Sequence, residues 1–255
     1  MPTKSPWVWT MKGMDADSAV HRTDPDIARG CRAMQAGFFP PNLFKFDLPK
    51  AGVPEVAFCG RSNVGKSTLV GTLINNTKLV RASKEPGCTR TVNYFGLTAP
   101  TRIKKGSEVD RAAVYMVDLP GYGFAKAPVQ EVQAWTAAVE GFIVNRDCAL
   151  LRRTFVLIDG RHGVKQHDED MMTLLDDHGV SYQIVLTKAD QLTKRDIAVV
   201  VEGVMRAAAR HAACYPVVHV VSARDGHGVL QLLDTIYYVT GLANANNFAI
   251  QEADI

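Results

Sequence analysis

The sequence predicts an α/β fold with a mostly parallel six-stranded sheet and helices on both faces. From Gly52 onward, short apolar runs alternate with longer amphipathic stretches, which is typical of strands that alternate with helices. The chemically distinctive residues come directly after the apolar runs. Because ligands of such sheets bind at the carboxyl ends of the strands, these observations together favour a ligand-binding α/β domain.

The expected elements follow from this alternation. Five apolar runs predict strands at 54–59, at the run from Ala112 to Asp118, and at 154–159, 182–187 and 216–221. Amphipathic stretches predict helices at 67–75, 129–144, 166–178, 193–213 and 229–239.

The chain length of 255 residues fits one domain with extensions at its ends. Residues 1–50 have no sustained periodicity, so we expect a flexible N-terminal extension whose end, 38–48, packs on the domain. Its start lacks the continuous apolar core of a secretory signal, which leaves an organellar targeting segment as one interpretation. We expect the domain itself at 51–242 and a polar, frayed tail at 243–255.

Composition limits the kind of protein. The net charge is +3 and the sequence pI about 8.6, which is compatible with an RNA-rich partner, although a solvated mixed-charge surface is the simpler explanation. The five cysteines include no C-x-x-C pair, which argues against a disulfide framework or a zinc site and favours a reducing compartment. No apolar run has the length of a membrane span, so we expect no membrane partner.

The motif after the first of these strands predicts a phosphate-binding loop. It is Gly60-Arg61-Ser62-Asn63-Val64-Gly65-Lys66-Ser67, which fits G-x-x-x-x-G-K-[ST]. In such loops, backbone N–H groups and the following helix N-terminus surround phosphate oxygens. Lys66 would contact the β- and γ-phosphates of a nucleoside triphosphate, and the Ser67 hydroxyl would bind Mg²⁺. The alternative is a chance match in an unrelated glycine turn.

A second motif, Asp118-Leu119-Pro120-Gly121, follows the apolar run that begins at Ala112. Asp118 offers the hard oxygen that Mg²⁺ prefers, through a water molecule, and the Gly121 N–H could sense a γ-phosphate. The alternative is a strand that ends in an ordinary turn. D-x-x-G is weak alone, so its position after a phosphate loop carries the argument.

Two further strand ends predict how a base is chosen. They carry Thr187-Lys188-Ala189-Asp190 and Val221-Ser222-Ala223. The Asp190 carboxylate can accept hydrogen bonds from guanine N1–H and N2–H₂, a donor pair that adenine lacks. The stem of Lys188 can cover the purine face, and the turn at Ser222 and Ala223 would offer a backbone N–H to guanine O6. Thr187 replaces the Asn that usually begins this motif, and a solvated loop is the alternative interpretation.

The segment between the phosphate loop and Asp118 contains Gly87-Cys88-Thr89-Arg90-Thr91. A threonine hydroxyl here would complete the Mg²⁺ shell only when a γ-phosphate is present, which would make the segment a switch. Thr89 and Thr91 both suit this role chemically, and a capping or turn hydroxyl is the alternative for either.

Taken in order, these motifs resemble those of the EngB-type GTPases, G proteins of the Era/TrmE-like class. The resembling segments are G-R-S-N-V-G-K-S, P-G-x-T, D-L-P-G-Y-G-F-A, T-K-A-D and S-A, with a D-x-R-H at 159–162. The resemblance implies a P-loop NTPase G domain that binds GTP and GDP with Mg²⁺ and hydrolyses GTP. It also implies that Thr89 is the switch threonine, because Thr89 follows Pro86 and Gly87 at the family's spacing.

The resemblance also implies a biological role and partners. The role is a molecular switch in assembly of the large ribosomal subunit, with the rRNA and ribosomal proteins of its precursor as partners of a monomeric protein. The candidate rRNA contacts are Lys126, Arg146, Arg152 and Arg153, with merely solubilising charges as the alternative. The long N-terminal extension implies a mitochondrial or other organellar matrix in a eukaryote, and otherwise the bacterial cytoplasm. Cys88 and Arg90 stand where the family usually has a basic residue and Gln.

The residue after Gly121 bears on catalysis. Ras-like proteins have a Gln there that orients the attacking water, whereas this chain has Tyr122, so we expect slow intrinsic hydrolysis. Lys66 and Asn63 are the candidate catalytic residues. Asn63 is similar to an Asn that binds K⁺ in potassium-activated GTPases, where K⁺ would add positive charge near the β/γ bridge; alternatively Asn63 only shapes the loop.

Two other functions compete with a GTPase switch. One is a GTP-dependent binding scaffold with little turnover in cell division or septation, a role also attached to the resembling family. The other is an adenine-specific P-loop enzyme, which Asp190 opposes.

Overall fold

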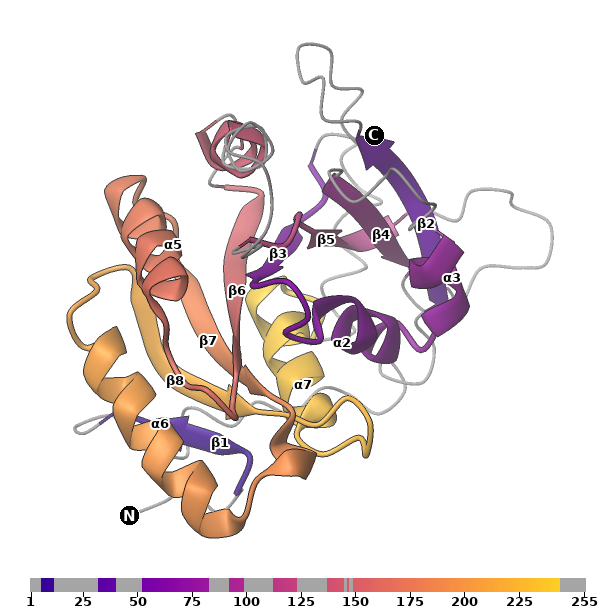
Figure 1. The fold of residues 1–255 in the computed structure, drawn as a ribbon. Coiled ribbons are helices and arrows are strands. Elements are labelled where there is room, and N and C mark those ends of the chain that lie inside the picture. The colour runs from indigo at the N-terminus through magenta and orange to yellow at the C-terminus, as the bar shows by residue number, and fades with distance from the viewer. Residues whose placement is uncertain are drawn as a thin grey trace, which may run out of the picture.

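The computed structural model describes residues 6–11, 32–39, 52–82, 92–98, 112–122, 137–144, 146 and 149–243. They form one mixed sheet with the strand order β1-β8-β7-β6-β3-β5-β4-β2 (Figure 1). The strands are β1 (Val8–Thr10), β2 (Arg32–Phe39), β3 (Glu55–Gly60), β4 (Val92–Thr98), β5 (Ala112–Asp118), β6 (Leu151–Asp159), β7 (Tyr182–Thr187) and β8 (Cys214–Val220). The five neighbours from β8 to β5 run parallel, and antiparallel strands flank them on both sides.

The predicted fold class is confirmed, but the number of strands is wrong. The sheet has eight strands rather than six, because two segments of the expected flexible extension are strands. β1 pairs with β8 and β2 pairs with β4, so the expectation of flexibility over 1–50 fails for 8–10 and 32–39. β1 and β2 each lie at an edge of the sheet and form main-chain hydrogen bonds with one neighbouring strand. Such pairing does not require a long apolar run in the sequence. The tail beyond Ala243 lies outside the described residues.

The described helices, apart from two short ones, lie close to where the apolar periodicity predicts them. The helices are α2 (Lys66–Leu73), α3 (Thr77–Ala82), α5 (Gln166–Asp177), the short 3₁₀ turn η2 (Ala189–Gln191), α6 (Lys194–Ala208) and α7 (Val229–Val239). The apolar periodicity does not predict α3 or the short η2. Residues 137–144 are also helical. α6 begins at a capping box, in which the Asp196 N–H donates to the Thr193 hydroxyl at 3.2 Å. It ends at Ala208, earlier than the expected 213. No described helix has both the length and the apolar character needed to cross a bilayer.

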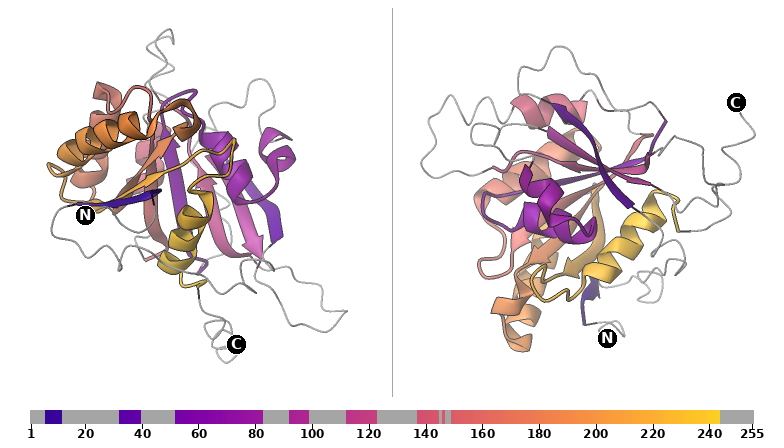
Figure 2. Two further views of the ribbon diagram at one scale, coloured as in Figure 1. Left: turned by 90° about the horizontal axis from the view of Figure 1, so that it is seen from below. Right: turned by 90° about the vertical axis from the view of Figure 1, so that its right-hand side faces the viewer.

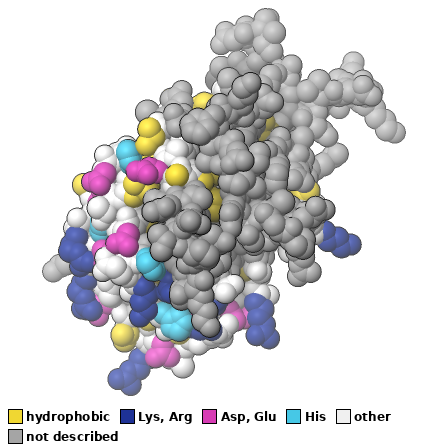
Figure 3. All heavy atoms as spheres, turned by 45° about the horizontal axis from the view of Figure 1, so that its top comes forward, with side chains coloured by type: hydrophobic (Ala, Val, Ile, Leu, Met, Phe, Trp, Pro, Cys, Tyr) yellow, Lys and Arg dark blue, Asp and Glu magenta, His cyan; other side chains and the backbone are white. Residues whose placement is uncertain are grey.

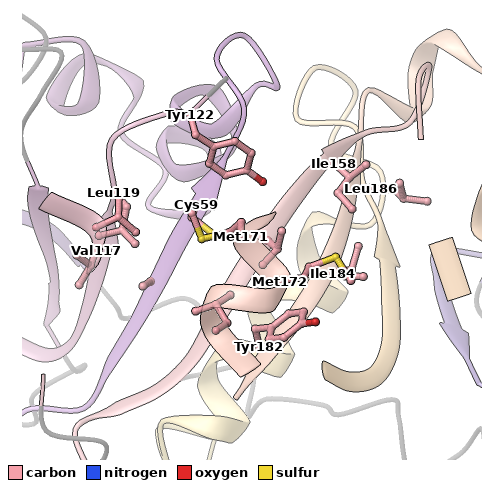
Figure 4. Packing of buried hydrophobic residues seen from close by; sticks show 14 of the residues in the cluster. Cys59, Val117, Leu119, Tyr122, Ile158, Met171, Met172, Tyr182, Ile184 and Leu186 are labelled. Atoms are coloured by element: carbon pink, nitrogen blue, oxygen red, sulfur yellow. The ribbon is translucent and has the colours of Figure 1, made fainter. Parts of the chain in front are cut away.

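Helices cover both faces of the sheet (Figure 2), and an apolar core lies on each face. Ala57 and Cys59 of β3 face the core that also contains residues from α5, α6 and 137–144, and Figure 4 shows part of this cluster. Val56 and Phe58 face the core that contains residues from α2, α3 and α7. The central strands are therefore buried on both sides, which explains their continuous apolar sequences. Because β3, β5, β7 and β8 are parallel, the motifs that follow them meet at one edge of the sheet.

Candidate nucleotide-binding site

The loop from Gly60 to Ser67 joins β3 to α2. Asn63 and Gly65 have left-handed backbone conformations, with φ of 64° and 101°. Gly65 is the N-cap of α2, and a side chain there would be strained at that φ. No side chain caps this helix start. The N–H groups of its first turn are therefore available to an anionic ligand.

Lys66, at the end of this loop, contacts Asp118 at the end of β5. The Lys66 Nζ donates to Asp118 Oδ1, and the two residues are only 9% and 2% exposed. A strand-end carboxylate and the loop lysine thus form one buried ion pair, although 52 residues separate them in the chain. Each charge compensates the other, so neither is left unpaired in a region with little water.

The Asp118–Gly121 turn is held against the phosphate loop by the main chain. The Tyr122 N–H donates to the Gly60 carbonyl at 3.2 Å, and the Ser62 N–H donates to the Tyr122 carbonyl at 2.8 Å. The Leu119 N–H donates to the Phe58 carbonyl at 3.0 Å. These bonds fix the spacing between the two predicted phosphate-contacting segments.

The Thr187–Asp190 segment is tied to the same loop by side chains. The Thr187 hydroxyl donates to the Val64 carbonyl at 2.7 Å, so this threonine links the two loops in place of the usual Asn. Lys188, itself left-handed with φ of 59°, donates from Nζ to the Asn63 carbonyl at 2.6 Å. The stem of Lys188 consequently runs beside the phosphate loop.

The predicted base-selecting carboxylate is oriented by the last motif. The Ser222 hydroxyl donates to Asp190 Oδ1 at 2.9 Å, and the Ala189 N–H donates to the Val221 carbonyl at 3.1 Å. The two predicted base-binding segments therefore form one connected unit.

All described members of the predicted site meet at this edge of the sheet. They are Gly60, Arg61, Ser62, Asn63, Val64, Gly65, Lys66, Ser67, Asp118, Leu119, Pro120, Gly121, Thr187, Lys188, Ala189, Asp190, Val221, Ser222 and Ala223. The predicted switch segment, Gly87, Cys88, Thr89, Arg90 and Thr91, lies outside the described residues.

Asp159 joins the site through Lys188. It accepts hydrogen bonds from Lys188 Nζ at 2.8 Å and from Arg161 Nε and Nη2 at 2.9 and 2.8 Å. Burial alone would raise the pKa of Asp159, but the hydrogen bonds from Arg161 and Lys188 outweigh burial and lower it. A firmly ionised Asp159 holds Lys188 against the loop. The D-x-R-H pattern pointed to this segment without indicating its partner.

Tyr122 and Asp168 form a pair that the sequence did not indicate. The Tyr122 hydroxyl donates to Asp168 Oδ1 at 2.9 Å, and the residues are 2% and 1% exposed. Figure 4 shows the Tyr122 ring within the core cluster that contains Cys59 and Met171. Burial raises the pKa of Asp168 and raises that of Tyr122 well above its ordinary value. The ring is thus part of the core, and its hydroxyl is bonded to Asp168.

Two of the candidate rRNA contacts have partners within the fold. Arg146 donates from Nε to buried Glu55 at 2.7 Å, and Arg153 lies over the Tyr215 ring at 4.0 Å while donating to Gln183 at 3.0 Å. Both side chains are thus engaged within the fold, which favours a structural role for them. Arg152 is exposed, and Lys126 lies outside the described residues. On the face drawn in Figure 3, described Lys and Arg side chains are interspersed with Asp, Glu and His.

Comparisons with known sequences identify related proteins. Residues 55–188 match the family described as 50S ribosome-binding GTPase. A "Probable GTP-binding protein EngB" of Rhodospirillum rubrum is 46% identical over 182 residues, which cover 71% of this chain and 74% of that protein. A protein of the same description from Cereibacter sphaeroides is 41% identical over 216 residues, covering 85% of this chain and 87% of that protein.

Solved structures share the fold. The crystal structure of a probable GTP-binding protein EngB has a TM-score of 0.52 at 20% identity and covers 73% of this chain and 98% of its own. A bacterial selenocysteine-specific elongation factor also gives 0.52, at 15% identity, over 75% of this chain and 29% of its own. Because the family model matches residues 55–188 and the sequence relatives are 46% and 41% identical, the chain belongs to the EngB-type GTP-binding proteins of the 50S ribosome-binding GTPase family.

Proposed function

We propose that this protein binds GTP and GDP with Mg²⁺, hydrolyses GTP slowly, and acts as a molecular switch in assembly of the large ribosomal subunit. The observation that carries the proposal is the buried pair of Lys66 and Asp118 beside the uncapped start of α2. Family membership supports the partner, a large-subunit precursor with its rRNA and ribosomal proteins.

The donor set at this point suits Mg²⁺. Asp118 is a buried carboxylate at a strand end, and Ser67 brings a hydroxyl to the first turn of α2. Hard oxygen donors of this kind are the ligands that Mg²⁺ prefers. Ser67, Asp118 and the switch residue Thr89 would hold the ion. When bound, Mg²⁺ supplies positive charge to the β- and γ-phosphate oxygens.

Nucleotide binding changes the partner of Lys66. In the structure its ammonium is paired with Asp118. The β- and γ-phosphates offer Lys66 a stronger acceptor set, while the N–H groups of the loop and of α2 surround the same oxygens. In this proposal the Gly121 N–H would donate to the γ-phosphate, and Asp190 would accept from the guanine edge.

Slow hydrolysis follows from Tyr122. Its ring is buried and bonded to Asp168, so it orients no water at the γ-phosphate. Asn63 remains the second candidate catalytic residue, through a K⁺ ion near the β/γ bridge. Its left-handed backbone gives an independent reason for Asn at this position, because Asn tolerates that conformation. Equal GTP hydrolysis rates in K⁺ and in Na⁺ would eliminate the potassium role.

The base assignment is tested by the Asp190→Asn variant. An amide in place of the carboxylate pairs better with xanthine, so preference should shift from GTP to XTP. The exposed Asp225→Asn substitution in the neighbouring turn is a matched control. Unchanged GTP affinity in Asp190→Asn would refute the assignment of guanine to this residue.

The role in assembly is tested by depletion followed by ribosomal particle profiling. Loss of mature large subunits with accumulation of their precursors is expected. Normal large subunits after depletion would overturn the assembly role.

A second candidate function is a GTP-dependent binding scaffold with little turnover in cell division or septation. The burial of Tyr122 favours the scaffold, because Tyr122 stands at the position of the catalytic Gln and is buried in the core. Multiple-turnover assays with and without large ribosomal subunits separate the two. Absence of both stimulation and co-sedimentation would favour the scaffold.

A further inference from the structure

The N-terminal strand lies against the strand that leads into the base-binding turn. β1 pairs antiparallel with β8, with Val8 opposite His219 and Trp9 opposite Val218 (Figure 1). The ladder continues beyond β1, because the Val220 N–H donates to the Trp7 carbonyl at 2.9 Å. Trp7 is thereby fixed next to the point where β8 ends and the turn begins.

Trp7 reaches that turn through a ring stack. Its indole lies on the imidazole of His227, with ring centroids 4.8 Å apart and planes inclined by 10°. The next residue, Gly228, has φ of +70°, and a Cβ there would collide with the Val220 carbonyl and lie 3.3 Å from Trp7 Cβ. The chain leaving the turn is therefore held closely against both β8 and Trp7.

His227 in turn closes the base-binding turn. The Ser222 N–H donates to the His227 carbonyl at 2.9 Å, and the Ser222 hydroxyl donates to Asp190 Oδ1 at 2.9 Å. The same hydroxyl accepts from the Asp225 N–H at 3.1 Å. A continuous series of contacts thus runs from Trp7 through His227 and Ser222 to the Asp190 carboxylate.

We infer that Trp7 and His227 are positioning residues for guanine recognition, which makes the N-terminal strand part of the base site. The inference rests on the proposed function, since that function assigns the base to Asp190. The stack fixes the turn before the base arrives, which reduces the conformational freedom lost on binding. Without the stack, Ser222 no longer holds the carboxylate in one orientation, while the phosphate contacts of the opposite loop remain.

The test compares full-length Trp7→Ala and His227→Ala variants with Trp9→Ala. Trp9 is a matched control because it lies on β1, two residues from Trp7, and is partly buried against the same core, but it is farther from the turn. Its indole N–H donates to the Pro6 carbonyl. The measurements are stopped-flow release rates and affinities of GDP and of IDP, which lacks the 2-amino group. Thermal unfolding is recorded for each variant.

The expected result separates positioning from stability. Trp7→Ala and His227→Ala should each speed GDP release by about three- to tenfold, as expected for loss of one aromatic stack. Both should reduce the ratio of GDP affinity to IDP affinity, whereas Trp9→Ala should lower only thermal stability. The double variant should match either single variant, because both break the same stack. Trp7→Phe and His227→Phe keep a ring and should restore slow release.

Two outcomes overturn the inference in distinguishable ways. The positioning role alone is overturned if the wild-type protein binds GDP but both alanine variants keep its GDP release rate and its preference for GDP over IDP. It is also overturned if Trp9→Ala changes GDP release and base preference as much as they do. A wild-type protein that does not hold GDP would overturn both the positioning role and the proposed function.

Discussion

The hydroxyl of Tyr122 donates a 2.9 Å hydrogen bond to the buried carboxylate of Asp168. The other carboxylate oxygen of Asp168 accepts from the Lys165 N–H at 2.9 Å, at the start of α5. The main chain of Tyr122 meanwhile bonds to Gly60 and Ser62 of the phosphate loop. Tyr122 therefore connects the phosphate loop to α5, since its main chain bonds to the loop and its hydroxyl bonds to Asp168 of α5. Its ring packs in the core.

The first prediction concerns Tyr122→Phe. Removing the hydroxyl leaves the buried Asp168 carboxylate with one partner fewer, so we expect the free energy of unfolding to fall by about 1–3 kcal/mol. The hydrolysis rate per folded molecule should be unchanged, because the ring lies in the core and its hydroxyl is bonded to Asp168. Urea denaturation and a GTPase assay measure the two quantities. Tyr238→Phe, on the exposed face of α7, is the control. Slower hydrolysis at unchanged stability would show that the ring acts on the reaction.

The second prediction concerns Thr187, whose hydroxyl donates to the Val64 carbonyl. Thr187→Val keeps the side-chain shape but leaves this buried carbonyl without that donor, at a cost of about 1 kcal/mol or more. Because the bond fixes the phosphate loop relative to the base-binding segment, GDP affinity should fall as well. Isothermal titration with GDP measures it.

Two further variants serve as the rescue and the control for Thr187→Val. Thr187→Asn restores a donor and should recover most of the GDP affinity. Thr173→Val, at an exposed position of α5, should change neither affinity nor stability. Full GDP affinity in Thr187→Val would show that this bond does not organise the site.

The central strands and the phosphate loop could be predicted because their signals are local. β3, β6 and β7 each contain a short apolar run, and a parallel sheet brings the motifs after them to one edge. β1 could not be predicted in this way, because three residues are too few to display a period. Its place depends on main-chain bonds to β8 and on the Trp7 stack, which are tertiary contacts.

The sequence also could not predict which charged side chains are buried. Asp168 is followed by Glu169 and Asp170, and acids are common in the first turn of a helix. Only the position of the Tyr122 hydroxyl distinguishes Asp168 from its neighbours. Arg146 resembled a surface base because a sequence shows charge but does not show an opposing buried carboxylate.

The third prediction is a pH dependence at Asp159. Hydrogen bonds from Arg161 and Lys188 outweigh burial and hold its pKa below the ordinary value of 3.8. An acid with a lowered pKa in the folded state stabilises the fold above its ordinary pKa, and this contribution is lost as the pH falls below that value. Asp159→Asn should therefore be less stable at neutral pH but lose less stability on acidification.

The measurement for Asp159 is a series of urea unfolding curves from neutral pH to the acid limit of folding. Asp177→Asn, an exposed acid at the end of α5, is the control and should follow the wild type. A constant offset between Asp159→Asn and wild type at every pH would contradict a lowered pKa in the folded state.

The fourth prediction concerns the buried pair of Glu55 and Arg146. The two side chains are 0% and 6% exposed, and Arg146 donates to both carboxylate oxygens. Removal of one partner leaves the other charge buried and uncompensated, so Arg146→Met should lower the free energy of unfolding by about 3–5 kcal/mol. Adding Glu55→Gln should recover a large part of this loss, which urea denaturation in a double-mutant cycle measures.

The pH dependence of Arg146→Met distinguishes a structural arginine from an RNA contact. Burial already raises the pKa of Glu55, and Arg146 opposes that rise, so its removal raises the pKa further. An acid with a raised pKa in the folded state destabilises the fold at high pH, and protonation relieves this as the pH falls. Arg146→Met should therefore regain stability between neutral and mildly acidic pH, whereas the double variant should not. Exposed Arg152→Met is the control. A loss no larger than that of Arg152→Met, together with weaker binding to large ribosomal subunits, would instead assign Arg146 to RNA contact.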